Sequence, residues 1–418
     1  MNLKLEMESI GQRAKIAADW IAQASATQKN QALTAMAEAI ANNQAMILDA
    51  NRQDVEQAKK QQYPEAFIDR LILDPKRIDA MVSAIHAISD LPDPVNRILS
   101  EWQVPSGLII KRVSMPLGVI GVIYESRPNV TADAAALCFK AGNAVILRGG
   151  SECAHSNQAI IASLHQGLRN VGMTIDIIQY VPTQDREAVG VLLQMSDYID
   201  VIIPRGGASL VKRVIAESRI PLFQHLQGLC HTYIHQAADK SMAIDIVVNA
   251  KMRRTGICGA TETLLIDEAV AATILPDLID VLIKKGCEIR GCDKTKEIDS
   301  RVKLASQSDW ETEYLDAILS IKIVKNLDEA VAHIRQYGSS HTESIVTNDN
   351  ESAAKFMNQM RSAIVMHNAS TQFADGGEFG MGAEIGISTG KLHARGPVGV
   401  EQLTTFHYYV TGNGQTRP

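Results

Sequence analysis

The chain has 418 residues, 46% of them hydrophobic and 21% charged, with a formal net charge of -6 at pH 7. This length predicts two or three lobes with cores of their own. The negative charge argues against a nucleic-acid or anionic-membrane surface, since both attract a basic face. Six cysteines are too few for a disulfide framework, which favours a reducing compartment.

The N-terminal stretch carries charges throughout, and no segment approaches about 18 uninterrupted apolar residues. Neither a secretory signal nor a membrane anchor is therefore expected. We predict a cytoplasmic protein.

Residues 5–62 are rich in Ala and Gln, with apolar residues at helical spacing, and predict two or three helices. Thr27 is the candidate N-cap of one of them. A polar, proline-containing connection is expected near 92–106, before the pattern changes.

From about residue 107, short apolar runs alternate with helical segments. Strands are expected at 117–125, 143–148, 175–181 and 199–204, and helices at 129–142, 156–170, 186–195 and 208–218. Such alternation predicts a parallel sheet covered on both faces. A second lobe of similar character is expected around Cys258. Residues 404–418 predict one strand and a loose end, and an exposed terminal strand invites pairing with another subunit.

Two glycine turns are candidates for phosphate binding. The stretch IIPRGGAS (202–209) runs from a strand through Gly206 and Gly207 into a helix, whose N-terminal N–H groups attract phosphate. The stretch LRGGSE (147–152) has the same form, and its Arg148 has the planar fork that suits the 2′-phosphate of NADP. Two such turns at the carboxyl ends of parallel strands favour a dinucleotide site.

Other glycine, histidine and cysteine clusters favour structural roles. GEFGMGAEIG (377–386) follows no strand and reads as a loop that needs close backbone approach. His225, Cys230, His231 and His235 resemble a metal set, but in a strand His231 and His235 lie about 13 Å apart. One zinc holds its nitrogens at about 2.1 Å, so no metal site is expected. CEIRGC (287–292) predicts an ordinary strand and turn.

Cys258, in TGICGATETLL, is the candidate nucleophile. Free cysteines are most often buried hydrophobes, and we expect that of Cys138, Cys153 and Cys230. Glycines at 256 and 259 allow a ligand close to the Cys258 sulfur. Nearby Lys251, Arg253 and Arg254 favour a thiol pKa below about 8.5. From the residues alone, a packing role and a nucleophilic role both stay open.

Four long motifs settle this choice by resemblance. They are YESRPNVTADAAALCFKAGNAVILRGGSE, RRTGICGATETLLID, GSSHTESIVT and GMGAEIGISTGKLHARGPVGVEQLTT. Together they resemble the gamma-glutamyl phosphate reductase (glutamate-5-semialdehyde dehydrogenase) family of the aldehyde dehydrogenase superfamily, in order and over essentially the whole chain. The resemblance implies an α/β fold with two Rossmann-like parallel-sheet lobes and a small oligomerisation arm.

The resemblance also implies an activity. L-glutamate 5-phosphate is reduced with NADPH to L-glutamate 5-semialdehyde, with release of phosphate, as the second step of proline biosynthesis. A cysteine thioester is the covalent intermediate, and Cys258 occupies the nucleophile position.

Further roles carry over residue by residue. Arg148 and Ser151 lie in the turn where the family binds the adenosine ribose, Gly206, Gly207 and Ser209 near the pyrophosphate, and Glu313 at the nicotinamide ribose. Asn129 lies near the oxyanion-hole asparagine, with Ser126 or Arg127 as alternatives. For the substrate, the matching loops offer His341, Ser388, Thr389, Lys391 and Arg395. A solvated loop role stays open for each of these five.

Two departures from the superfamily are informative. Oxidative aldehyde dehydrogenases have a glutamate that activates the hydrolytic water, whereas Gln227 stands near that place here. An amide is no general base, which suits a reductase whose thioester must not be hydrolysed. Many members of the reductase family have Asn after the cysteine, and this chain has Gly259.

These inferences give a domain plan with two rivals. Residues 1–102 and 117–228 are predicted to form the cofactor-binding domain, 229–398 the catalytic domain, and 103–116 with 399–418 the oligomerisation arm. By resemblance a homo-oligomer is expected, and a glutamate 5-kinase is a possible partner. The rival functions are an NAD(P)-dependent aldehyde dehydrogenase that hydrolyses its thioester, and a catalytically silent nucleotide-binding or assembly protein.

Overall fold

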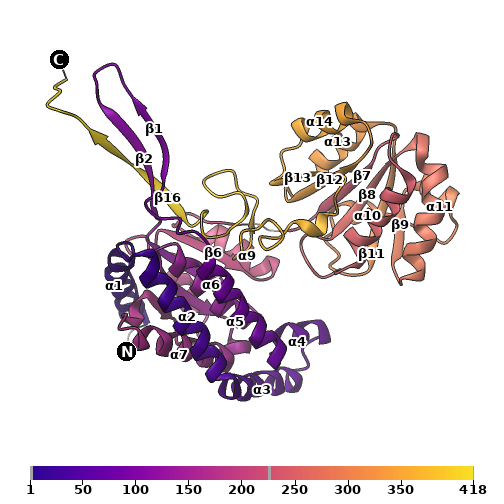
Figure 1. Cartoon of the computed structure of the whole chain (residues 1–418). Helices are drawn as coiled ribbons and strands as arrows, with labels where there is room; N and C mark the ends of the chain where they lie inside the picture. The colour runs from indigo at the N-terminus through magenta and orange to yellow at the C-terminus, as the bar shows by residue number, and fades with distance from the viewer. Residues whose placement is uncertain (1–2, 225–226, 418) are drawn as a thin grey trace. The chain divides into compact units, whose positions relative to one another are not determined.

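A computed structural model describes residues 3–224 and 227–417. It divides into two compact units, which are described separately. Unit 1 comprises Met1–Gln224, Gly380–Gly386 and Val398–Pro418, and unit 2 comprises His225–Phe379 and Ile387–Pro397. Each unit has its own parallel sheet, so the predicted α/β class with two parallel-sheet lobes is confirmed (Figure 1).

Helices form the first part of unit 1: α1 (Leu3–Ile21), α2 (Ala26–Asn42), α3 (Gln44–Lys60), α4 (Glu65–Leu71) and α5 (Pro75–Asp90). The sequence predicted Thr27 as the N-cap of α2, and this prediction is wrong. The N-cap is Ser25. Ser25 accepts from the Gln28 backbone N–H while the Gln28 side chain accepts from the Ser25 N–H. This capping box satisfies the backbone N–H groups of Ser25 and Gln28. Thr27 lies inside the helix and is not its cap.

The unit 1 sheet has four parallel strands in the order β5-β4-β3-β6. Its elements are β3 (Val119–Tyr124), β4 (Ala144–Gly149), β5 (Ile178–Tyr180) and β6 (Val201–Arg205), with helices α6 (Asn129–Lys140), α7 (Ala154–Asn170), α8 (Glu187–Leu192) and α9 (Ala208–Glu217), and the short helices η1 (Ser151–Cys153) and η2 (Ile175–Ile177). Every residue of β3 and β4 is buried, as their apolar runs predict. The strand order reverses between β3 and β6.

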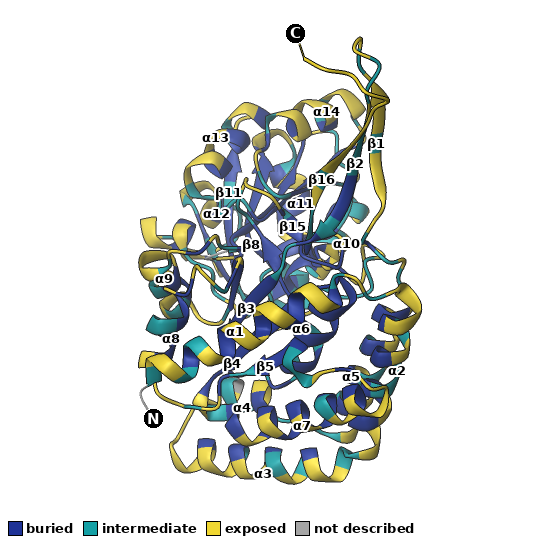
Figure 2. Cartoon of the chain, turned by 90° about the vertical axis from the view of Figure 1, so that its left-hand side faces the viewer, coloured by how far each residue is buried: buried dark blue, intermediate teal, exposed yellow. Residues whose placement is uncertain are grey.

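A three-stranded antiparallel sheet also belongs to unit 1. It contains β1 (Ile98–Gln103), β2 (Ile109–Pro116) and β16 (Thr404–Thr411), with β2 in the middle. The outer strands are mostly exposed, as the yellow colouring in Figure 2 shows. The sequence predicted a connection near 92–106, which includes β1. Apolar and polar residues do not alternate along this strand, ILSEWQ, so no strand was predicted there.

Unit 2 is built on a seven-stranded parallel sheet in the order β10-β9-β11-β8-β7-β12-β13. The strands are β7 (Cys230–Ile234), β8 (Thr261–Asp267), β9 (Glu288–Gly291), β10 (Lys303–Leu304), β11 (Ile318–Val324), β12 (Thr342–Val346) and β13 (Ile364–His367). The helices are α10 (Lys240–Met252), α11 (Glu268–Lys284), α12 (Asp293–Ile298), α13 (Leu327–Tyr337) and α14 (Asn350–Gln359), with η3 (Gln307–Glu311), η4 (Thr371–Phe373) and the hairpin β14 (Ile387–Ser388)–β15 (Gly396–Pro397).

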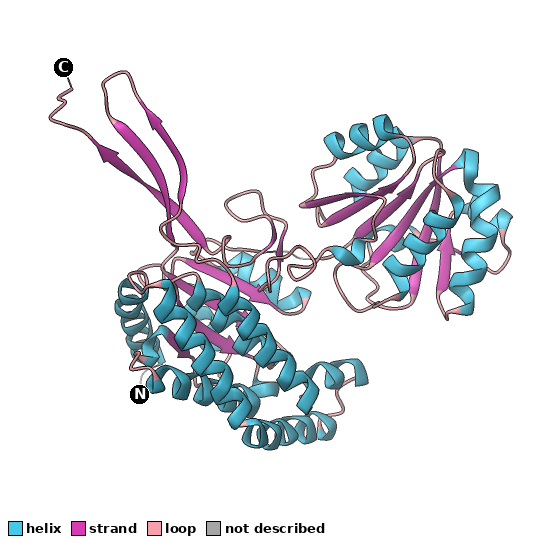
Figure 3. Ribbon diagram, in the orientation of Figure 1, coloured by secondary structure: helices cyan, strands magenta, loops and turns pink. Residues whose placement is uncertain are grey.

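Helices cover both faces of this sheet (Figure 3). Leu264 and Ile266 of β8 join the core cluster with α10 and α11, whereas Leu265 joins the cluster with α13 and α14. Successive residues of a strand point to opposite faces, so β8 anchors both layers.

The segment Gly380–Gly386 interrupts unit 2 in sequence but belongs to unit 1. A Cβ at Gly382 would lie 3.0 Å from Leu91 Cδ1, and one at Gly386 would lie 3.1 Å from Arg205 Cδ. The glycines thus permit the close packing that the sequence predicted for this loop. Among residues 3–224 and 227–417, no helix is both long and apolar enough to cross a bilayer.

Gly167 generates a test of how α7 packs on α2. A Cβ at this position would lie 2.5 Å from Met36 Cα. We expect Gly167→Ala to lower the free energy of unfolding by about 1–3 kcal/mol, because backbone must move. Gly190→Ala in α8 is the matched control, since its Cβ meets only Arg213 Nη2 at 3.6 Å. Equal urea midpoints for the two variants would contradict this packing.

Candidate active site

Cys258 lies in the turn between α10 and β8. It is partly exposed, whereas Cys138, Cys153 and Cys230 are buried, as the sequence predicted. Burial raises the pKa of the three buried thiols well above the ordinary value of a cysteine. The Cys258 side chain packs beside an apolar cluster of Ile364, Met366, Ala374 and Ile387.

Predicted residues of unit 2 gather at one edge of its sheet. Cys258 precedes β8, Glu313 precedes β11, and His341 immediately precedes β12. Parallel strands begin at the same edge, so the segments that enter them are neighbours. The site therefore lies at the amino ends of these strands.

Gly228 connects Glu313 to Cys258. A Cβ at Gly228 would clash with the Cys258 carbonyl oxygen and would lie 2.5 Å from Cys258 Cα. The Gly228 N–H donates to Glu313 Oε1 at 2.9 Å. Burial raises the pKa of Glu313, which the hydrogen bond from Gly228 opposes. Gly228 thus contacts both the Glu313 carboxylate and the Cys258 backbone.

His341 contacts the Cys258 segment through Cys230. The Cys230 thiol donates to the Cys258 carbonyl oxygen at 3.0 Å, and His341 Nδ1 lies 3.4 Å from the same sulfur. His341 is fully buried and also lies 2.9 Å from Thr342 Oγ1. The solvated loop alternative for His341 is therefore wrong, while its contact with substrate stays a prediction.

Lys251, one of the cations that the sequence placed near Cys258, has a carboxylate partner of its own. Its ammonium is fully buried and forms a 2.5 Å ion pair with Glu262, so a carboxylate compensates its charge. Arg253 and Arg254 are exposed. Lys251 stands out instead as part of a buried pair that sequence patterns did not indicate.

The predicted substrate loop forms the β14–β15 hairpin of unit 2. Ser388 is buried and pairs with Gly396, one residue from Ile387 in the apolar cluster beside Cys258. Thr389 is half-buried, and Lys391 is exposed. Arg395 donates to the Arg361 carbonyl oxygen. The structure thus brings the Ser388 strand against the cysteine cluster and leaves Lys391 in solvent.

All of the predicted cofactor residues except Glu313 gather at the carboxyl ends of the unit 1 strands. Arg148 ends β4, Ser151 starts η1, and Gly206, Gly207 and exposed Ser209 lead β6 into α9. The strand order reverses between β3 and β6, and open α/β sheets bind ligands at such a reversal. The residues present therefore fit a dinucleotide.

A carboxylate missed by sequence reasoning occupies this reversal. Glu125 follows β3 directly, and its Oε2 accepts from the Gly207 N–H at 3.1 Å. The N-terminus of a helix favours negative charge through its unpaired N–H groups. Glu125 thus shows that the start of α9 accepts an anionic oxygen. Its place at the end of a strand next to β6 is the signal that points to it.

Arg148 is buried and fastens a loop to β4. Its Nη2 donates to the carbonyl oxygens of Gln184 and Asp185 at 3.2 and 3.3 Å, and its Nη1 donates to Gly149 O. A phosphate would offer stronger, charge-assisted acceptors than these carbonyls. The NADP role of Arg148 stays a prediction.

Asn129, at the start of α6, belongs to unit 1, whereas Cys258 belongs to unit 2. Its Nδ2 donates to Asp133 Oδ2 at 2.9 Å. Burial raises the pKa of Asp133 to about 6, and this hydrogen bond opposes the rise. The alternative Ser126 has φ +49° and donates its N–H to Glu152 Oε1 at 2.6 Å. The oxyanion-hole role of each stays a prediction.

His231 of β7 and His235, which follows this strand, have structural partners. His231 Nδ1 lies 2.9 Å from Glu343 Oε2, and His235 Nδ1 lies 2.9 Å from Thr347 Oγ1. His225 lies outside the described residues. Within the described chain, no group of three or more His, Cys, Asp or Glu side chains could hold a metal.

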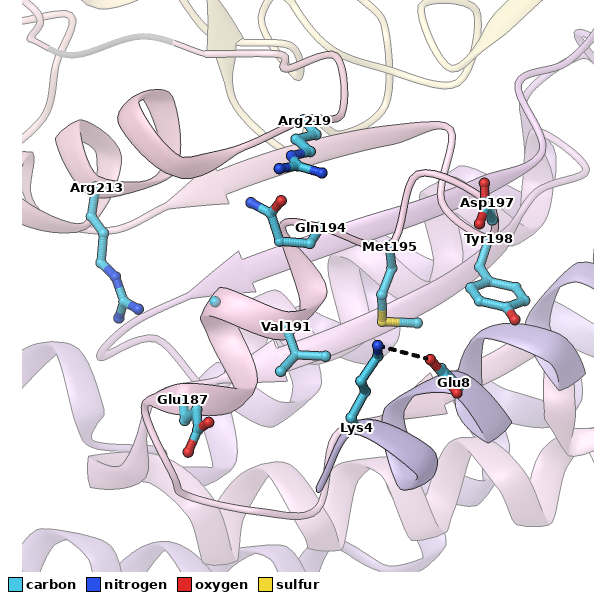
Figure 4. Close-up of a pocket in the computed structure, with 11 residues that line it drawn as sticks. Lys4, Glu8, Glu187, Val191, Gln194, Met195, Asp197, Tyr198, Arg213 and Arg219 are labelled. Atoms are coloured by element: carbon cyan, nitrogen blue, oxygen red, sulfur yellow. Dashed lines mark ion pairs between the residues drawn. The ribbon is translucent and has the colours of Figure 1, made fainter. Parts of the chain in front are cut away.

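Unit 1 also has a cavity of about 590 Å³ between α1, α8 and the segment that follows α9 (Figure 4). Arg213 of α9 and Arg219 line it together with Lys4 and Glu8. None of the predicted site residues lies there. Among its charged side chains, Lys4 pairs with Glu8 and Arg213 pairs with Glu217.

Known proteins share this architecture. Residues 4–285 match the model of the aldehyde dehydrogenase family. A gamma-glutamyl phosphate reductase of Paramagnetospirillum magneticum is 59% identical over 99% of this chain and 97% of its own length. The crystal structure of the Thermotoga maritima gamma-glutamyl phosphate reductase matches with a TM-score of 0.96 and 41% identity over 99% of this chain and 100% of that one.

A more distant structure, an engineered glycolyl-CoA reductase with bound NADP+, has a TM-score of 0.68 at 15% identity, over 97% of this chain and 96% of that one, and shares the fold alone. The chain belongs to the aldehyde dehydrogenase family and, within it, to the gamma-glutamyl phosphate reductases. The resemblance found in the sequence motifs is thereby confirmed.

Gly228 generates a test of the site geometry. We expect Gly228→Ala to lower kcat/KM by about 100-fold, because the added Cβ displaces the Cys258 backbone and misplacement by about 1 Å has that effect. Steady-state rates give kcat/KM, and a circular dichroism spectrum shows whether the variant is folded. Unchanged kinetics in a folded variant would show that the close approach is irrelevant.

Proposed function

We propose that Cys258 is the nucleophile of a phosphate-releasing reduction. Reduction of gamma-glutamyl phosphate, a step of proline biosynthesis, is the activity of the family to which the chain belongs. The Cys258 thiolate attacks the acyl carbon of L-glutamate 5-phosphate, and phosphate leaves with the electron pair of the broken C–O bond. A glutamyl thioester remains on the enzyme.

NADPH, when bound, supplies the hydride that converts the thioester into L-glutamate 5-semialdehyde and releases the Cys258 thiolate. Glu313 is the residue proposed for its nicotinamide ribose. The carboxyl-end loops of unit 1, with Arg148, Ser151, Gly206, Gly207 and Ser209, are proposed for the rest of the dinucleotide. Unit 1 is thus the proposed cofactor-binding part and unit 2 the proposed catalytic part.

The observation that carries the proposal is the turn around Cys258. A partly exposed thiol lies against a glycine, Gly228, whose N–H binds the half-buried carboxylate of Glu313. Gln227, exposed and one residue before Gly228, is no base for hydrolysis. This arrangement favours acyl transfer to hydride over acyl transfer to water.

Three broader assignments complete the proposal. The exposed strands β1 and β16 are proposed to pair subunits into a homo-oligomer, with the arm at 103–116 and 399–418 as predicted. A glutamate 5-kinase is the proposed source of the unstable acyl phosphate. The cytoplasm is the proposed location.

A covalent adduct tests the nucleophile. With L-glutamate 5-phosphate supplied and NADPH withheld, we expect intact-mass spectrometry to show a glutamyl adduct on the wild-type chain and none on Cys258→Ala. The same wild-type protein should reduce NADP with the semialdehyde only when phosphate is present. Strong turnover without phosphate would favour the hydrolysing aldehyde dehydrogenase instead.

Arg148 tests the cofactor preference. We expect Arg148→Ala to raise the KM for NADP by about tenfold or more and to change the KM for NAD much less, because a charge-assisted hydrogen bond contributes about 1.5–3 kcal/mol. Arg148→Lys, which keeps the charge without the planar fork, should fall between. Equal effects on both nucleotides would assign Arg148 to loop structure alone.

A further inference from the structure

A buried ion pair lies next to the candidate active site. Lys251, near the end of α10, and Glu262, in β8, have fully buried side chains whose Nζ and Oε2 lie 2.5 Å apart. Burying two charges costs several kcal/mol each, and well-packed apolar residues often replace such pairs without loss of stability. Stability alone is therefore a weak reason for this pair.

The second oxygen of Glu262 holds a loop. Glu262 Oε1 accepts from the Leu315 N–H at 3.3 Å. Leu315 has φ +52°, a left-handed conformation that costs a leucine about 1–2 kcal/mol and persists only where surroundings hold it. The Glu262 carboxylate is one such restraint.

This loop also reaches the cysteine turn. The Leu315 carbonyl oxygen lies 3.9 Å from the position of a Cβ at Gly256, two residues before Cys258. Glu313, two residues before Leu315, binds the Gly228 N–H. The loop at 312–317 is therefore fastened at Leu315 by Glu262 and at Glu313 by Gly228.

We propose that Lys251 and Glu262 are positioning residues for Glu313. Glu262 binds the Leu315 N–H, Lys251 fixes the Glu262 carboxylate, and the pair thereby sets where the Glu313 carboxylate meets the nicotinamide ribose. Neither residue touches the reacting atoms. This inference rests on the proposed function, in which Glu313 binds that ribose.

The charges within the cluster fit this arrangement. Burial is the largest influence on Glu262 and raises its pKa to about 7, while Lys251 and the Leu315 N–H lower it. Without Lys251, the buried carboxyl would take up a proton more readily. Lys251 thus favours the charged form of Glu262.

Two double variants that share Lys251→Met and differ at position 262 test the proposal. Lys251→Met with Glu262→Leu fills the space without charge and leaves the Leu315 N–H without its acceptor. Lys251→Met with Glu262→Gln restores an acceptor oxygen. For the first we expect an NADP dissociation constant about tenfold weaker, and for the second a value near wild type.

A second measurement, made without NADP, accompanies the dissociation constants. Amide hydrogen exchange of the segment 312–317 should be faster in K251M/E262L than in K251M/E262Q, because only the former loses the hydrogen bond to Leu315. Tyr233→Phe, which removes a buried hydrogen bond to Asp267 far along β7, is the control for general loosening. It should leave exchange at 312–317 unchanged.

The outcomes separate this inference from the proposed function. Equal exchange and equal NADP affinity in the two double variants would overturn it, even if the wild-type chain forms the Cys258 adduct. A wild-type chain without that adduct would instead defeat the proposed function. If K251M/E262L does not fold, Glu262→Asp replaces it, since its shorter side chain keeps the charge but does not reach Leu315. Wild-type exchange and affinity in Glu262→Asp would equally overturn the inference.

Discussion

All seven strands of the unit 2 sheet run in one direction, and the segments that enter them therefore gather at one edge. Cys258, Glu313 and His341 are far apart in sequence, yet each lies just before a strand of this sheet. Gly228, before β7, completes the group and lets two backbones approach more closely than any side chain would allow. The site depends on this shared edge more than on any single motif.

Electrostatic interactions fix the carboxylates at the same edge of the sheet. The buried carboxylate of Glu262 and the half-buried carboxylate of Glu313 lie at this edge, and burial raises the pKa of both. A backbone N–H and the Lys251 charge oppose the rise in both, and only Glu262 contacts the Lys251 ammonium directly. Unit 1 shows a related solution at α9, where the Glu125 carboxylate accepts from Gly207. At each of these three places a fixed donor holds a carboxylate in a defined position.

Local patterns predicted much of the fold correctly. The fully apolar runs of β3 and β4, and the helices that follow them, are recognisable because parallel strands are buried on both faces. Strand β1 was not recognisable, since an exposed outer strand needs no apolar alternation. The predicted N-cap of α2 was two residues too late. Ser25 and Thr27 are both good capping residues, and only the hydrogen bonds between Ser25 and Gln28 distinguish them.

By itself, the sequence determined the two parallel-sheet lobes, the glycine turns and, through its long motifs, the family and the candidate cysteine. These are properties of residues that are neighbours in the chain. Only the tertiary structure decided that Lys251 pairs with Glu262, that Glu125 lies at Gly207, and that Gly228 separates Cys258 from Glu313. Those contacts join residues 11 to 85 positions apart. Their partners are set by strand order and burial, which no local pattern encodes.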